Sequence, residues 1–126
     1  MVPSAKLQVV VFTDTFFETN GVGSYYRTVL DWCRRTEGIR AIVICPTGPD
    51  GKSGQVGDDV ISVRPTFPFR NPVYSHLTLG YFPQAKLCKI VNAITGPKVI
   101  HVATSGVLGV AGARVARRLG LPLVGC

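Results

Sequence analysis

The stretch from Leu7 to Arg35, LQVVVFTDTFFETNGVGSYYRTVLDWCRR, decides the predicted fold. It opens with a continuous apolar, β-branched run at residues 7–13, which is typical of a strand covered on both faces, as in a parallel sheet. A helical pattern follows, with Asn20 or Ser24 as its cap, and runs to about Arg35. A buried strand that leads through a polar turn into an amphipathic helix predicts the first half of a β–α–β unit.

Apolar residues recur in this helix at three- and four-residue spacing, which predicts a buried stripe along one side. The predicted stripe consists of Val22, Tyr25, Tyr26, Val29, Leu30 and Cys33. Trp32 is likewise expected to pack against the body of the protein rather than to bind a ligand.

Strand and helix patterns alternate along the rest of the chain. Buried strands are predicted at 40–45, 60–63, 98–103 and 121–125, and helices at 84–94 and 107–119. The last helix is rich in Ala and Gly, so it can pack tightly on a sheet, and Gly120 is its expected C-cap. This alternation predicts an α/β fold, a Rossmann-like three-layer arrangement whose parallel sheet carries helices on both faces and is incomplete at its C-terminal edge.

Two segments do not fit the alternation. Residues 46–59 are rich in Gly, Pro and Asp, and they are expected to form an exposed loop without structure of its own. Residues 65–83 hold four prolines and six aromatic or histidine residues, which predicts an irregular loop with a function.

Composition limits the class of protein. The 126 residues are 46% hydrophobic and 17% charged, which indicates one folded domain covering residues 1–126. No apolar run reaches the ~18 residues of a membrane span, so a cytoplasmic protein is expected. The four cysteines form no Cys-x-x-Cys pair, which favours reduced, buried thiols and no metal site.

The net charge is +7, with basic residues spread along the chain and only two adjacent pairs, Arg34–Arg35 and Arg117–Arg118. No basic run interleaves with aromatic residues, so a nucleic-acid partner is not expected. A phosphorylated ligand, an anionic membrane surface and a plain solvated surface all stay open.

Gly21 and Gly23 lie at the start of the first helix, where unpaired N–H groups and a partial positive charge favour an anion. A dinucleotide fingerprint would need a third glycine at the position of Tyr26, and the chain has no Gly-Lys-Ser/Thr triplet. The two glycines therefore predict either a phosphate-binding turn or merely a flexible helix entrance.

The segment TDTFFETNGVGSYYRTVLDWCRR resembles the first strand, glycine loop and first helix of retaining glycosyltransferases of family 4, which have two Rossmann domains (the GT-B architecture). The family pattern is roughly Thr-Asp-x-Phe/Tyr-x-Pro-x-x-Asn-Gly-Val. The chain matches it at Thr13, Asp14, Phe16, Asn20, Gly21 and Val22. It departs from the pattern at Glu18, where proline is common.

A second block, KVIHVATSGVLGVAGARVARRLGLPLVG, resembles the family's Val-Ile-His-Val-Ala-Thr-Pro-Gly-x-Leu-Gly segment, with Ser105 in place of the proline. RPTFPFRNPVYSHLTLGYFP is similar in character to the family's acceptor loop. The resemblance therefore covers essentially the whole chain.

The resemblance implies an N-terminal, acceptor-side domain and assigns residues to two sites. The donor diphosphate would lie against Gly21, Val22 and Gly23. The lipid or saccharide acceptor would be bound by Asp14, Arg70, Tyr74, His76, Thr104 and Ser105. A nucleotide-sugar would be the donor substrate, and neither a cofactor nor a catalytic residue is expected in this chain.

Further expectations follow for the chain by itself. The donor-binding second domain is missing, so the chain alone is expected to transfer no sugar. Its last strand would leave an exposed sheet edge that favours self-association, and the aromatic loop at 66–82 could touch the inner membrane surface peripherally. Asp14 could instead cap a turn, and His101 could be a core residue. The alternative is a stand-alone, flavodoxin-like module that binds a phosphate or nucleotide, or mediates an interaction.

Overall fold

The computed structural model describes residues 7–14, 21–47, 54–55, 59–64, 66–70, 78–104 and 106–125. Its main sheet has six strands in the order β3-β4-β2-β1-β7-β8. The strands are β1 (Leu7–Phe12), β2 (Ile39–Pro46), β3 (Gly54–Gln55), β4 (Val60–Val63), β7 (Lys98–Val102) and β8 (Leu123–Gly125). All neighbouring strands from β4 to β8 pair in parallel.

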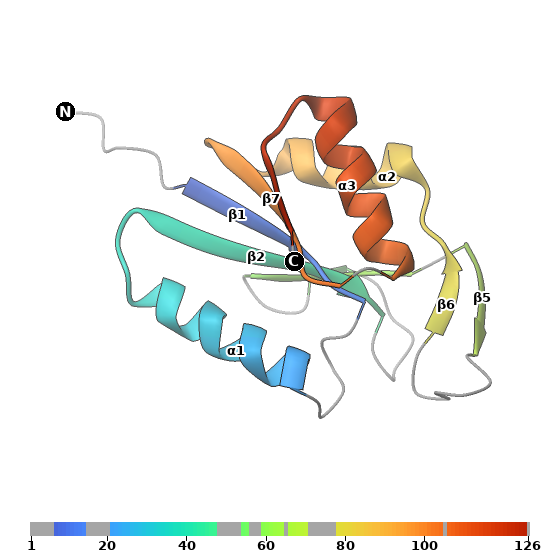
Figure 1. Cartoon of the computed structure of the whole chain (residues 1–126), viewed down its shortest axis with the longest axis horizontal. Helices are drawn as coiled ribbons and strands as arrows, with labels where there is room; N and C mark the ends of the chain where they lie inside the picture. Colours follow the sequence, from blue (N-terminus) through green and yellow to red (C-terminus); the bar gives the residue numbers. More distant parts are fainter. Residues whose placement is uncertain are drawn as a thin grey trace.

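Helices cover both faces of this sheet (Figure 1). Helix α1 (Gly21–Arg34) packs on one face through Tyr26, Leu30 and Cys33. Helices α2 (Gln84–Ala93) and α3 (Val107–Leu119) pack on the other face. Successive β1 residues alternate between the two cores, with Val11 toward α1 and Phe12 toward α2 and α3. The predicted three-layer, Rossmann-like α/β fold is confirmed.

Two predictions about loops are wrong. Residues 54–55 form β3, which pairs antiparallel with Ser62 and Ile61 of β4. The supposedly irregular segment contains an antiparallel pair, β5 (Thr66–Arg70) and β6 (Thr78–Tyr81). The register between them shifts between Thr66 and Phe69, around Pro68. Proline cannot donate to a ladder but is tolerated at a bulge in an edge strand, so its presence did not prevent strand formation.

The predicted stripe on α1 is too wide. Tyr25 is 61% exposed and Trp32 53% exposed, whereas Tyr26 and Leu30 are buried. Among the described residues, no other helix lies beside α1 on its face of the sheet, so the flanks of α1 meet no neighbouring helix there. The amphipathic pattern located the helix correctly but overestimated how far round its surface packing extends.

The cysteines are reduced where the structure describes them. Cys33 and Cys45 are buried, Cys88 is partly buried, and Cys126 lies outside the described residues. Burial raises the pKa of the Cys33 thiol, and the nearby carboxylate of Asp59 raises this pKa further. Both effects disfavour the reactive thiolate.

Helix α3 approaches the sheet very closely. A Cβ atom added to Gly109 would lie 1.7 Å from the carbonyl oxygen of Thr104, and one added to Gly112 would lie 2.4 Å from the ring of Phe12. Gly120 ends the helix in the left-handed conformation with φ 66°, and its N–H donates to the carbonyl oxygens of Ala116 and Arg117. The predicted tight packing and the predicted C-cap are both confirmed.

No helix in the described part of the chain is long and apolar enough to cross a lipid bilayer.

We expect Gly112→Ala to destabilise the fold by about 1–3 kcal/mol, because the added methyl group overpacks the contact with Phe12. This loss should appear although alanine is intrinsically the better helix residue. Urea unfolding followed by circular dichroism measures the difference. Gly125→Ala is the matched control, since its Cβ would meet no atom within 4 Å. Equal midpoints for the two variants would refute the close-contact explanation.

Candidate functional site

The candidate site lies where the strand order of the main sheet reverses. From β1 the chain moves to β2 and β4 on one side, and it then crosses to β7 and β8 on the other. In open parallel sheets, ligands bind at this switch point, beyond the carboxyl ends of the strands. Asp14 follows β1 and Thr104 follows β7, so both residues stand at that position.

Asp14 and Thr104 are joined by two hydrogen bonds. The backbone N–H of Asp14 donates to Oγ1 of Thr104 at 2.9 Å, and the same hydroxyl donates to Oδ2 of Asp14 at 2.5 Å. The threonine hydroxyl therefore accepts from one end of the aspartate and donates to its other end. This Asp14–Thr104 clamp ties the ends of the two central strands together.

The carboxylate of Asp14 also caps α3. Leu108 N donates to Oδ1 at 2.7 Å, and Gly109 N donates to Oδ2 at 3.2 Å. Gly106, at the N-cap position of α3, contributes no side-chain bond, and a Cβ atom there would lie 2.5 Å from the Asp14 carboxylate. Asp14, which follows β1 and lies more than 90 residues earlier in the chain, thus supplies the missing cap. Its negative charge suits the positive end of the helix.

This arrangement bears on the two predicted roles of Asp14. The aspartate caps a distant helix rather than a turn close to it in sequence. Contact with an acceptor hydroxyl remains a prediction for Asp14 and for Thr104.

Helix α1 begins at Gly21, so residues 21–23 form its first turn. Amides of a first turn have no carbonyl partner within the helix, and the first turn of α1 contains no acidic residue. Both α1 and α3 begin toward the side of the sheet where β1 and β2 end (Figure 1). One helix start is thus occupied by Asp14, whereas the other is headed by Gly-Val-Gly.

The remaining predicted acceptor residues are only partly placed. Arg70 is the last residue of β5, opposite Thr78 of β6. Tyr74, His76 and Ser105 lie outside the described residues.

His101 is a partly buried residue of β7 that faces α1. Its Nε2 lies 2.8 Å from the hydroxyl of Tyr26, at hydrogen-bonding distance. The two rings are also in contact, with centroids 5.9 Å apart. Burial lowers the pKa of His101, which favours the neutral ring in this position.

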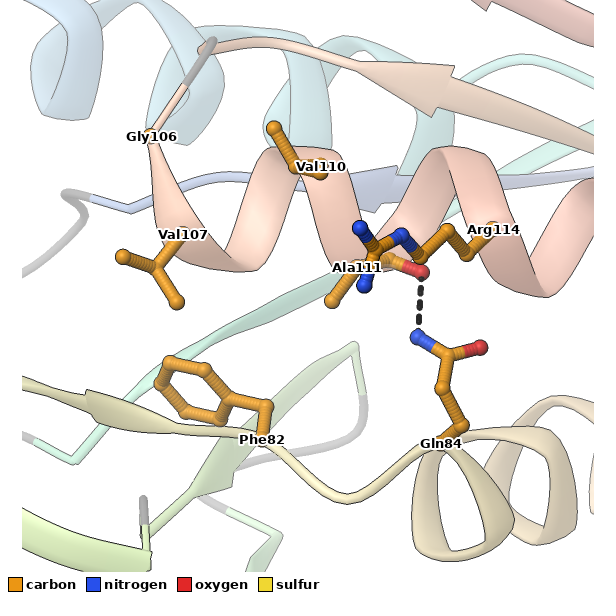
Figure 2. Close-up of a pocket in the computed structure, with 7 residues that line it drawn as sticks. All are labelled: Phe82, Gln84, Gly106, Val107, Val110, Ala111 and Arg114. Atoms are coloured by element: carbon orange, nitrogen blue, oxygen red, sulfur yellow. Dashed lines mark hydrogen bonds between the residues drawn. The ribbon is translucent and has the colours of Figure 1, made fainter.

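A pocket of about 430 Å³ lies beside the start of α3. Figure 2 shows Phe82 and Gln84 on one side and α3 residues on the other, with Gln84 Nε2 donating to the carbonyl oxygen of Ala111 at 3.0 Å. Its lining residues are Phe82, Gln84, Gly106, Val107, Val110, Ala111 and Arg114. Sequence reasoning missed this pocket, although the outward spacing of Val107, Val110 and Arg114 at three and four residues was a usable signal.

The family match and the similar proteins agree with each other. Residues 19–126 match the family described as Glycosyltransferase Family 4. The chain is 34% identical over 122 residues to a GDP-mannose-dependent alpha-mannosyltransferase of Mycobacterium tuberculosis. It is 32% identical over 122 residues to a protein of the same description from Mycolicibacterium smegmatis. Each match covers 94% of this chain but only 31% of the relative, so the chain spans about a third of their length. No solved structure matches it.

We expect Asp14→Ala to destabilise the protein by about 2 kcal/mol, because it removes the cap of α3 and leaves the Thr104 hydroxyl without its acceptor. Chemical unfolding measures the effect. Asp31→Ala is the control, since Asp31 forms an exposed ion pair with Arg35 four residues away, and its loss should cost only about 0.5 kcal/mol. A cost for Asp14→Ala no greater than that of the control would contradict the capping role.

We expect stability to fall as the pH drops below the ordinary His pKa of 6.5. Burial lowers the pKa of His101 in the folded protein, so the unfolded chain binds the proton more tightly. The contribution of neutral His101 to stability is complete above the pKa of the unfolded state. It is lost as the pH falls toward the lower pKa of the folded state. Urea midpoints at about pH 7.5 and about pH 5.5 test this. His101→Gln should reduce the difference between the two midpoints. An unchanged difference would show that other groups cause the pH dependence.

Proposed function

This chain belongs to Glycosyltransferase Family 4, and from that premise we propose that it is the acceptor-side domain of a retaining glycosyltransferase. The whole protein would move a hexose from a nucleotide-sugar donor to a lipid or saccharide acceptor. The observation that carries the proposal is that two helices, α1 and α3, begin near the carboxyl ends of the strands. The start of α3 is filled by the Asp14 carboxylate, whereas the start of α1 is formed by Gly21, Val22 and Gly23.

The donor diphosphate would lie against the first turn of α1. Its backbone amides and the positive end of the helix suit an anion, and the absence of side chains at Gly21 and Gly23 permits close approach. The α3 start is the poorer anion site, because a phosphate there would face the negative charge of Asp14. The names of the two mycobacterial relatives specify GDP-mannose, which makes GDP-mannose the first donor to test.

The acceptor would lie on the other side of the Asp14–Thr104 clamp. We assign its binding to Asp14 and Thr104, which follow two central strands, to Arg70 at the end of β5, and to Tyr74, His76 and Ser105. The two hydrogen bonds of the clamp support one part of this assignment, since they hold Asp14 and Thr104 together at the switch point. A cytoplasmic protein that touches the membrane peripherally would meet both a soluble donor and a lipid acceptor.

Sugar transfer would need more of the protein than this chain. The mycobacterial relatives are about three times as long as the matched region, and glycosyl transfer in a two-domain enzyme depends on closing both halves around donor and acceptor. The chain alone would then bind substrates without transferring sugar.

We expect the purified chain to bind GDP and GDP-mannose weakly, with no release of GDP from GDP-mannose in the presence of lipid or saccharide acceptors. Titration followed by isothermal calorimetry measures binding. Gly23→Asp should weaken it about fivefold or more, because a carboxylate would stand where the diphosphate binds.

Two controls separate charge from shape in this titration. Gly23→Ala adds a methyl group without charge and should weaken binding less than Gly23→Asp. Asn92→Asp adds the same charge at an exposed position of α2 and should leave binding unchanged. Equal affinity for the native chain and Gly23→Asp would overturn the diphosphate assignment, and turnover by the chain alone would overturn the need for a second domain.

A further inference from the structure

Tyr26 makes a polar contact between α1 and the other half of the main sheet. Two further buried residues of this helix, Leu30 and Cys33, belong to an apolar cluster with residues of β1, β2 and β4. Tyr26 is 7% exposed, and its hydroxyl oxygen lies 2.8 Å from Nε2 of His101 on β7. Because β1 separates β2 from β7 in the sheet, this contact reaches across β1.

Polar contacts hold α1 near each of its ends. Toward the C-terminal end, Nε of Arg34 donates to Oδ2 of Asp59 at 3.0 Å. Toward the N-terminal end, Tyr26 follows Gly21 by five residues, which is about 7.5 Å along the helix axis. Apolar packing has no preferred direction, whereas a hydrogen bond restricts the angle between its partners. The contact of Tyr26 with His101 therefore restrains the part of α1 that begins with residues 21–23.

Strand β7 connects this contact to the Asp14–Thr104 clamp. Thr104 follows His101 by three residues, and between them Ala103 N donates to the carbonyl oxygen of Phe12 on β1 at 3.0 Å. The Thr104 hydroxyl then bonds to Asp14, which caps α3. The end of one strand is thus bonded to α1 through His101 and to the cap of α3 through Thr104.

We propose that Tyr26 and His101 are positioning residues for the donor site. Their hydrogen bond holds the first turn of α1 at a constant separation from the Asp14–Thr104 clamp. A diphosphate on that turn and an acceptor at the clamp are then aligned with each other, and small errors in such alignment are costly for a transfer reaction. This inference rests on the proposed function, because it requires the first turn of α1 to bind the donor.

The chemistry of the pair fits positioning better than packing alone. His101 is only partly buried, and burial lowers its pKa, so the ring is uncharged at neutral pH and the contact is a neutral hydrogen bond. Two polar groups in a partly buried place gain little net stability over apolar side chains of similar size. The pair adds a fixed orientation, which an apolar contact would not supply.

The test compares Tyr26→Phe with the native chain. The variant keeps the ring and loses the hydroxyl, so the first turns of α1 should loosen while the chain stays folded. Hydrogen exchange measured by mass spectrometry should be faster for the amides of residues 25–28, which bond to the carbonyl groups of the first turn. Affinity for GDP, measured by calorimetry, should fall about fivefold, because the ligand must order the loosened turn in order to bind.

Tyr25→Phe is the matched control for this comparison. It removes the same hydroxyl group from the neighbouring residue, which is 61% exposed, and it should change neither the exchange nor the affinity. Two substitutions of His101 separate the hydrogen bond from the packing. His101→Gln can still bond to the Tyr26 hydroxyl and should keep most of the affinity, whereas His101→Leu cannot and should behave like Tyr26→Phe. Urea unfolding verifies that each variant is folded under the conditions of the titration.

Failure of this inference and failure of the proposed function give different results. If the native chain binds no GDP, the diphosphate assignment fails, whereas faster exchange in Tyr26→Phe would still support the restraint of α1. If the native chain binds GDP and Tyr26→Phe binds it equally well, the positioning role is overturned. Equal losses of affinity in Tyr25→Phe and Tyr26→Phe, or equal exchange in Tyr26→Phe and the native chain, would overturn it as well.

Discussion

The hydrogen bonds of the Asp14 carboxylate hold together the part of the fold on which the candidate site depends. One side chain joins the end of β1 to the end of β7 and to the first turn of α3. Charge-assisted hydrogen bonds are stronger than neutral ones, and here they satisfy amides that the helix itself cannot satisfy. The position of α3 on the sheet is fixed twice, by this cap at its start and by the contacts of Gly109 and Gly112 with the strands.

The same interaction makes the starts of α1 and α3, both near the carboxyl ends of the strands, chemically different. The start of α3 already holds a negative charge, so it attracts no second anion. The start of α1 has no acidic residue in its first turn, and two of its first three residues are glycines. A donor with a diphosphate and an acceptor with hydroxyl groups need different surroundings, and in the proposed assignment the two helix starts would supply them side by side. In that assignment the Thr104 hydroxyl would face the acceptor, although it is already hydrogen-bonded to Asp14.

The sequence allowed the layered fold to be predicted well, and the site only in part. Buried parallel strands read as continuous apolar runs, so β1, β2, β4 and β7 were located to within about one residue at each end. The prolines at 65–83 concealed the β5–β6 pair, because proline usually argues against a strand. The exposure of Tyr25 and Trp32 depended on which neighbours α1 meets, and helical spacing alone does not give that information. Asp14 was predicted to contact the acceptor or to cap a nearby turn, but not to cap α3, because its partners Leu108 and Gly109 lie more than 90 residues away, where no local pattern connects them.

The two edges of the main sheet differ in a way that affects how further chain can be added. At one edge, the two-residue β3 runs against its neighbour and ends the parallel series. At the other edge, β8 continues that series, and its Leu123 and Val124 are 50% and 51% exposed. Within the described sheet, the outer backbone groups of β8 have no adjoining strand. The two lateral edges of the sheet are therefore unequal. An additional strand, whether from the same polypeptide or another, gains both backbone hydrogen bonds and apolar contact beside β8. Beside β3 it could pair with only two residues.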